Sequence, residues 1–195
     1  VPSSILSFPG PLDDFDSLAG GNPQVSGQYE ENFLYECETS SRWKKLAELL
    51  EKGDSFLALF PEQALAASFF ELLPPQVQKS ALLWPATGGK KLQDAWIAAR
   101  KGSVLGIVGG PGAVFAPISR IRSIIVDEES SGAYRTYRHP FLNIRTVAAR
   151  KALLEKAGLT LSGRLPSSRV YLRGKPRCTP PSSRENVKFV DLKNG

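Results

Sequence analysis

Residues 123–130 (SIIVDEES) place a short, mostly β-branched apolar run directly before three consecutive acids. An apolar run of this kind is typical of a parallel strand that is buried on both faces of its sheet. Open parallel sheets bind their ligands at the carboxyl ends of the strands, which is where these acids follow. The stretch therefore predicts a parallel sheet, with Asp127 and Glu128 as candidate catalytic residues at its carboxyl edge.

The rest of the chain alternates between short apolar runs and amphipathic segments. Strands are expected at 32–35, 55–60, 81–84, 104–108, 123–126, 160–161 and 187–190, and helices at 42–52, 63–73, 90–101 and 144–156. The last two strands flank a loop rich in Pro, Ser and Arg, and Gly158 is the expected stop of the last helix. This alternation predicts an α/β fold, a mostly parallel sheet with helices on both faces. Residues 1–30, rich in Pro, Gly and Ser, predict a linker or irregular segment, which leaves 31–195 as the domain.

Charge is distributed unevenly along the 195 residues, whose net charge is +6. Residues 135–195 hold 14 Lys and Arg against 3 Asp and Glu. A basic segment of this kind favours a polyanionic partner such as DNA, and a solvated surface that aids solubility is the alternative. No apolar run approaches the roughly 18 residues of a membrane span, so no membrane partner is expected.

Cysteine and histidine are scarce in this chain. Two cysteines, Cys37 and Cys178, with one histidine exclude a zinc cluster built within the chain, and no metal site is expected. Both thiols are expected to be free in a reducing cytoplasm. The chain begins at Val1 and contains no methionine, which indicates a piece of a longer protein.

An ordered series of motifs resembles the first RecA-like motor domain of the PriA family, superfamily 2 DNA helicases of replication restart. Residues 59–65 (LFPEQAL) are similar to the family's LVPEIALT, and residues 94–102 (DAWIAARKG) to its DAWRRARRG. Residues 109–117 (GGPGAVFAP) parallel GTRSALFAP, and residues 124–134 (IIVDEESSGAY) parallel IIVDEEHDSSY. The spacing agrees from about Phe33 to Asp191, and Arg145, Ala148 and Ala152 fall where the family has its RDxAxxRA helix.

The resemblance implies a RecA-like P-loop NTPase fold, with Asp127 holding Mg²⁺ and Glu128 positioning the attacking water. It also implies Mg²⁺–ATP as cofactor if the site works, and otherwise none is expected. The implied partners are forked or single-stranded DNA, single-stranded-DNA-binding protein and other replication-restart proteins. A second motor lobe and any zinc-binding insertion would follow Gly195.

The phosphate-binding loop departs from the family's GVTGSGKTEVY, because residues 36–46 read ECETSSRWKKL. Such a loop needs glycines that aim backbone N–H groups at phosphate, a lysine, and a hydroxyl for Mg²⁺. Here the degenerate nucleotide-binding positions are Thr39, Ser40, Ser41 and Arg42, followed by Trp43 where the family has threonine. Pro111, Ser130 and the run 162–167 (SGRLPS) replace further residues that couple hydrolysis to movement in the family.

Three functional hypotheses follow from this pattern. We favour a PriA-like motor domain in which ATP hydrolysis is lost or crippled. The alternatives are an active ATP-dependent 3′–5′ DNA helicase domain and a non-catalytic DNA-binding or scaffold domain. An unrelated α/β enzyme that reaches this motif order by chance is a weaker fourth interpretation.

Each candidate residue also has a structural interpretation. Asp127 and its neighbouring acids are either a vestigial catalytic site or a solvent-facing strand end. Arg42 is either a phosphate ligand or the start of an exposed helix. The tryptophans at 43, 84 and 96 are expected to be core or half-buried rather than base-stacking platforms, and His139 is expected at the surface. The DNA-binding candidates, which as an alternative form a solvated basic loop, are Arg164, Arg169, Arg173, Lys175 and Arg177, with Arg184 in the same cluster.

Overall fold

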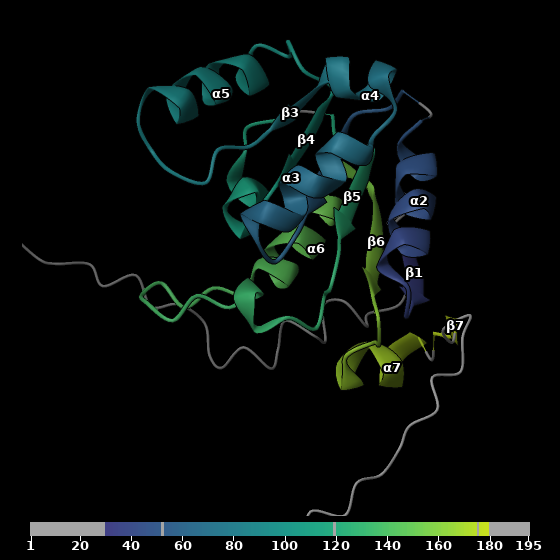
Figure 1. Ribbon diagram of the computed structural model, residues 1–195. Helices are drawn as coiled ribbons and strands as arrows, with labels where there is room; N and C mark the ends of the chain where they lie inside the picture. Colours follow the sequence, from purple (N-terminus) through teal and green to yellow (C-terminus); the bar gives the residue numbers. More distant parts are fainter. Residues whose placement is uncertain (1–29, 52, 119, 175, 180–195) are drawn as a thin grey trace, which may run out of the picture.

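Seven strands form one sheet, in the order β3-β4-β2-β5-β6-β1-β7, and every pairing between them is parallel (Figure 1). The computed structural model describes residues 30–51, 53–118, 120–174 and 176–179. Within these ranges the strands are β1 (Glu31–Glu36), β2 (Phe56–Leu59), β3 (Ala81–Leu83), β4 (Gly106–Gly109), β5 (Ser123–Val126), β6 (Gly158–Gly163) and β7 (Cys178–Thr179). The predicted α/β class is confirmed. The strand expected at 187–190 and the segment 1–29 lie outside the described residues.

Helices cover both faces of the sheet, as predicted (Figure 1). They are α2 (Thr39–Leu50), α3 (Gln63–Leu72), α4 (Pro75–Ser80), α5 (Lys90–Arg100), α6 (Ile144–Glu155) and α7 (Ser168–Gly174), with short 3₁₀ turns η1 (Pro111–Phe115) and η2 (Gly132–Tyr134). Apolar residues of α2, α3 and α4 pack in one buried cluster, and those of α5, α6, α7 and η1 pack in the other. No helix in the described ranges is long and apolar enough to span a membrane.

The alternation of side chains along β2 explains why its sequence is apolar at every position. Leu57 and Leu59 belong to the cluster on the α5 and α6 face, whereas Phe56 and Ala58 belong to the cluster on the other. Successive side chains of a strand point to opposite faces, so a strand buried on both sides needs an unbroken apolar run. Gly106 of β4 lies beside Phe56, and a Cβ at Gly106 would clash with that ring, so any larger residue there would force the ring to move.

Two sequence expectations about local structure are wrong, and one short helix forms where no element is expected. The Pro-, Ser- and Arg-rich stretch after β6 is not all loop, because α7 forms within it and buries Val170. A short helix, α4, begins at Pro75, where proline at the first helical position costs no hydrogen bond. Gly158 does not stop α6, because the helix ends at Glu155 and Lys156 adopts the left-handed conformation (φ 56°) before β6 begins.

Candidate functional site

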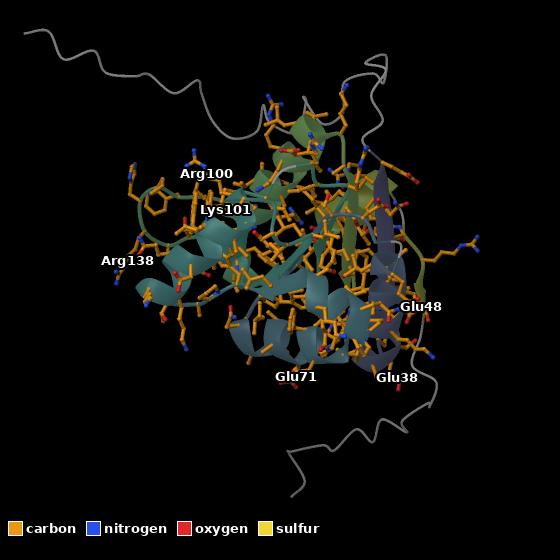
Figure 2. All side chains as sticks on the ribbon, turned by 90° about the horizontal axis from the view of Figure 1, so that it is seen from above. Glu38, Glu48, Glu71, Arg100, Lys101 and Arg138 are labelled. Atoms are coloured by element: carbon orange, nitrogen blue, oxygen red, sulfur yellow. The ribbon has the colours of Figure 1, made fainter. Side chains whose placement is uncertain are left out.

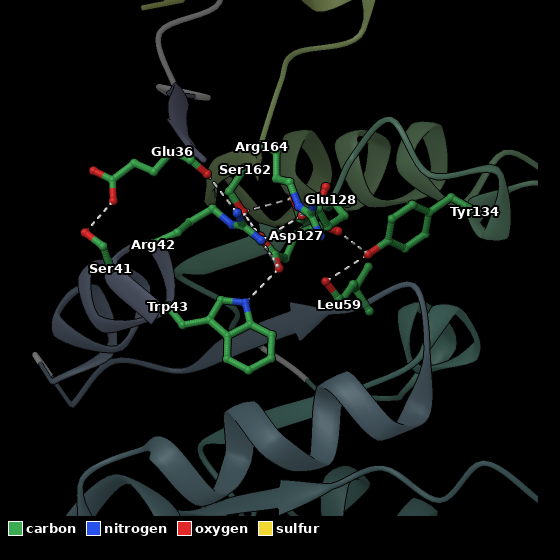
Figure 3. A network of polar contacts seen from close by, with 11 residues as sticks. Glu36, Ser41, Arg42, Trp43, Leu59, Asp127, Glu128, Tyr134, Ser162 and Arg164 are labelled. Atoms are coloured by element: carbon green, nitrogen blue, oxygen red, sulfur yellow. Dashed lines mark hydrogen bonds and ion pairs between the residues drawn. The ribbon is translucent and has the colours of Figure 1, made fainter. Parts of the chain in front are cut away.

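The guanidinium of Arg42 lies at the carboxyl edge of the sheet, in contact with the acids that follow β5 (Figure 3). Its Nε donates to Oδ1 of Asp127 at 2.9 Å, and its Nη2 donates to Oε1 of Glu128 at 2.8 Å. Its Nη1 donates to the backbone oxygen of Glu36, at the end of β1, at 2.9 Å. Only 1% of the Arg42 side chain is exposed. A single buried cation therefore joins the end of β1 to the end of β5.

The carboxylate of Asp127 is saturated with hydrogen bonds from the protein. Oδ1 accepts from the hydroxyl of Ser162 at 2.8 Å as well as from Arg42. Oδ2 accepts from the indole N–H of Trp43 at 2.8 Å, and the Nη2 of Arg42 lies 3.4 Å from it. A carboxylate offers about four lone-pair directions, so these contacts use all of them.

Trp43 contacts the carboxylate of Asp127, and Tyr134 contacts its backbone oxygen (Figure 3). The indole of Trp43 packs edge-on against Phe60 and Phe69, with ring centroids 5.7 and 5.8 Å apart. The hydroxyl of Tyr134 donates to the backbone oxygen of Asp127 at 2.7 Å, and burial raises the pKa of Tyr134 well above its ordinary value. The neutral phenol therefore remains a donor that holds the strand end.

The loop between β1 and α2 is held by its own side chains. The carboxylate of Glu36 accepts from Ser41 at 2.7 Å and forms an ion pair with Lys45. Burial raises the pKa of Glu36, but the hydrogen bonds from Lys45 and Ser41 outweigh it and leave that pKa below its ordinary value. Residues 36–42, all within the described part, contain no glycine and no positive φ. The helix begins at Thr39 after an extended Glu38, so the backbone turns directly into α2.

A second buried network surrounds Glu129, and no local sequence pattern indicates it. Its Oε1 accepts from the hydroxyl of Tyr35 at 3.1 Å and from the backbone N–H of Ser167 at 2.7 Å. Its Oε2 accepts from Ser167 Oγ at 3.1 Å and forms an ion pair with Arg145. Burial, and then the charge of Glu129, raise the pKa of Tyr35. Ser167 directly precedes α7, so this network anchors that helix to the end of β5.

The structure corrects two interpretations of the acidic cluster. Asp127 and Glu129 are not a solvent-facing strand end, because they are 0% and 3% exposed. Arg42 does not begin an exposed helix, because it is the fourth residue of α2 and is buried. Both misinterpretations treated charged side chains as exposed, whereas here opposite charges compensate one another in the interior.

Of the predicted loop residues, Thr39, Ser40 and Ser41 form the first turn of α2. Trp43 and Trp84 are buried as predicted, whereas Trp96 is 42% exposed, and His139 is exposed as predicted.

The basic candidates surround α7, and their charges are partly paired. Arg173 forms an ion pair with Glu31, and Arg164 lies 3.8 Å from Glu128. Arg169 lies on α7 and Arg177 is exposed, while Lys175 and Arg184 lie outside the described residues. No group of three His, Cys, Asp or Glu side chains in the described ranges is placed to hold a metal ion.

The strand order, the two helical layers and the acids at the carboxyl edge fit the RecA-like α/β domain that the sequence predicts. By sequence, the chain is similar to PriA proteins. It is 32% identical over 127 residues to Replication restart protein PriA of Chlamydia pneumoniae, covering 64% of this chain and 17% of that protein. It is 29% identical over 175 residues to Probable replication restart protein PriA of Deinococcus radiodurans, covering 86% and 19%. The chain thus spans about a fifth of the length of the curated relatives it matches.

Two further comparisons add little. No family model matches the chain. Among solved structures, the DUF1998 helicase MrfA bound to DNA shares 13% identity at a TM-score of 0.49, over 74% of this chain and 22% of that one. A TM-score this low carries no conclusion about the chain.

Proposed function

We propose that this chain is the motor-domain part of a PriA-like replication restart protein that acts on DNA without turning over ATP. The observation that carries the proposal is the guanidinium of Arg42, which takes both Asp127 and Glu128 as partners in a buried site. In an active motor of this type, these two acids would serve Mg²⁺ and the attacking water. Here an internal cation satisfies them instead.

The residues present do not fit a bound Mg²⁺–nucleotide. A metal ion at Asp127 would have to displace Arg42, Trp43 and Ser162 from its oxygens. Breaking one side of a buried ion pair leaves an uncompensated charge and costs about 3–5 kcal/mol. The acids Glu36 and Glu38 also flank the loop where phosphate would have to bind, and like charges repel.

DNA binding is proposed for the surface around α7. Arg164 and Arg177 are exposed, and residues 135–195 carry 14 of the 25 Lys and Arg residues of the chain. Phosphate contacts from such residues give affinity that is independent of sequence and falls with salt. Arg173 forms an ion pair with Glu31 and its side chain is 39% exposed, whereas the side chain of Arg164 is 70% exposed despite its longer contact with Glu128. We therefore assign the main contacts to Arg164 and Arg177.

ATP turnover with forked DNA tests the first part of this proposal. We expect the same background rate from the wild-type chain and from Glu128→Gln. Since the chain spans about a fifth of its relatives, the measurement is repeated on any longer protein that contains it. A DNA-stimulated rate that Glu128→Gln abolishes would favour the active helicase instead.

Fluorescence anisotropy with labelled single-stranded and forked DNA tests the second part. Replacing Arg164 and Arg177 with serine should weaken binding and lower the slope of log affinity against log salt by about one for each lost contact. The matched control replaces Lys44 and Lys45, on α2, with serine and should leave the slope unchanged. Equal slopes for wild type and the double variant would exclude this surface.

A further inference from the structure

An apolar groove lies beside α5, outside the site described above. Its volume is about 310 Å³, and the residues that line it are uncharged. Aromatic and proline side chains make up much of its wall: Trp84, Pro85, Leu92, Trp96, Pro111 and Phe115. Trp96 and Phe115 are 42% and 50% exposed, which is unusual for side chains of this size in a folded domain.

The floor of the groove is held firmly. The side chain of Gln63 donates to the backbone oxygen of Trp84 at 2.8 Å and accepts from the N–H of Gly110 at 3.3 Å. Trp84 and Trp96 lie with their ring centroids 6.3 Å apart at a tilt of 56°. The groove therefore joins the ends of β3 and β4 to α5 as a preformed surface, which is the usual state of a binding groove.

The helix beside the groove is basic. Lys90, Lys91, Arg100 and Lys101 are all exposed on α5 or directly after it, and Asp94 is the one acid between them. Figure 2 shows Arg100 and Lys101 on the side of the molecule away from the acidic residues Glu38, Glu48 and Glu71. An occupant of the groove should therefore combine apolar side chains with negative charge.

The chain contains one segment of that composition. Residues 12–18 read LDDFDSL, with an apolar residue at every third position and three aspartates, and residues 1–29 contain no Lys or Arg. We propose that this segment docks in the groove, with the ring of Phe15 against Trp96 and Phe115, and with its aspartates facing the cations of α5. Aromatic pairs in offset or edge-on contact stabilise such docking beyond the area that they bury.

The chain is long enough for this contact. Eleven residues lie between Leu18 and Glu30, the first described residue, and the twelve Cα–Cα steps that join the two can span about 40 Å when extended. β4 lies four strand spacings from β1. Four spacings amount to about 19 Å, and the six residues of β1 add about 20 Å along the strand.

The indole N–H signal of Trp96 in a ¹⁵N–¹H spectrum of the full chain tests the proposal, with buried Trp43 as the internal reference. Phe15→Ala should shift the Trp96 signal and leave that of Trp43 in place. Phe8→Ala, which removes a ring outside the acidic stretch, is the matched control and should shift neither. Replacing Lys90 and Lys91 with serine should reproduce the effect of Phe15→Ala, whereas Lys44→Ser should not.

A Trp96 signal that is identical in the wild type and in Phe15→Ala would overturn the proposal. If oligothymidylate then shifts this signal, the groove is a nucleic-acid surface instead. Adding a synthetic peptide of residues 11–19 to Phe15→Ala should restore the wild-type position, and 1 M NaCl should weaken that effect because salt screens the charges.

Discussion

Arg42 and Asp127 are 85 positions apart in the chain, yet the Nε of Arg42 donates to Oδ1 of Asp127 across 2.9 Å. Each side chain is 1% exposed. The pair links α2 to the end of β5 across β6, which lies between β1 and β5 in the sheet. A buried ion pair contributes little net stability compared with apolar residues of similar volume, but it is costly to break from one side. The pair therefore contributes little to net stability, and its main effect is to hold Arg42 against the carboxylate of Asp127.

Removing the cation of this pair should destabilise the fold strongly. Arg42→Ala leaves the carboxylate of Asp127 buried without its counter-charge, so we expect the free energy of unfolding to fall by about 3–5 kcal/mol. Urea denaturation measures this as a lower midpoint with an unchanged slope.

The matched control is Lys44→Ala, which removes an exposed lysine from the same helix. Exposed charges contribute about 0–1 kcal/mol, so this variant should stay close to wild type. If Arg42→Ala cost no more than Lys44→Ala, the pair with Asp127 would not constrain the folded state.

Acid should weaken the fold partly through Glu36. Its pKa is lowered in the folded state, despite the opposing effect of burial, by hydrogen bonds from Lys45 and Ser41. A group of this kind contributes stability above its ordinary pKa of 4.5, and that stability is lost as the pH falls through the lowered value. Glu36→Gln should therefore flatten the loss of stability below about pH 4.5.

Glu31 should affect the pH dependence of stability in the opposite direction to Glu36. Burial raises its pKa, with the charges of Arg173 and Arg145 acting against that change. Its contribution is therefore present at low pH and lost as the pH rises through the raised value. Glu31→Gln should make the acid loss steeper, opposite to Glu36→Gln. The same change in both variants would contradict these assignments.

The network of Glu129 should control the local stability of α7. Glu129→Gln keeps the size of the side chain but removes the charge that pairs with Arg145. It also weakens the acceptor for the N–H of Ser167, which directly precedes the helix. Hydrogen exchange should then become faster in α7 while the amides of α5 remain unchanged. Unaltered protection of α7 would show that Val170 and its apolar neighbours hold the helix alone.

Local pattern was sufficient to predict much of the fold. The apolar run of β5 was predicted with its observed bounds, Ser123–Val126, because a strand buried on both faces has an unbroken apolar sequence. Trp43, Leu46, Ala47 and Leu50 likewise have the spacing of one helical face, and they form the buried face of α2. In contrast, α7 was missed, because a seven-residue helix that buries only Val170 has too weak a periodic signal.

The candidate site could be predicted only in part. Motif order placed Asp127, Glu128 and Arg42 among the site residues, and the structure brings all three together. Their mutual pairing has no local signature, because sequence does not say which distant charge an arginine will meet. The same holds for Glu129, whose partners include Tyr35, 94 positions away.

Titration calorimetry with Mg²⁺–ATP tests the central claim most directly, that an internal cation has replaced the nucleotide. With Arg42 on both acids and no glycine loop to wrap phosphate, the wild-type chain should show no binding tighter than about millimolar, or roughly −4 kcal/mol. Arg42→Lys restores the family's residue at that position but neither the glycines nor the hydroxyl, and it should bind no more tightly. A micromolar dissociation constant for the wild type, lost in Arg42→Ala, would contradict the claim and show that Arg42 is itself a phosphate ligand.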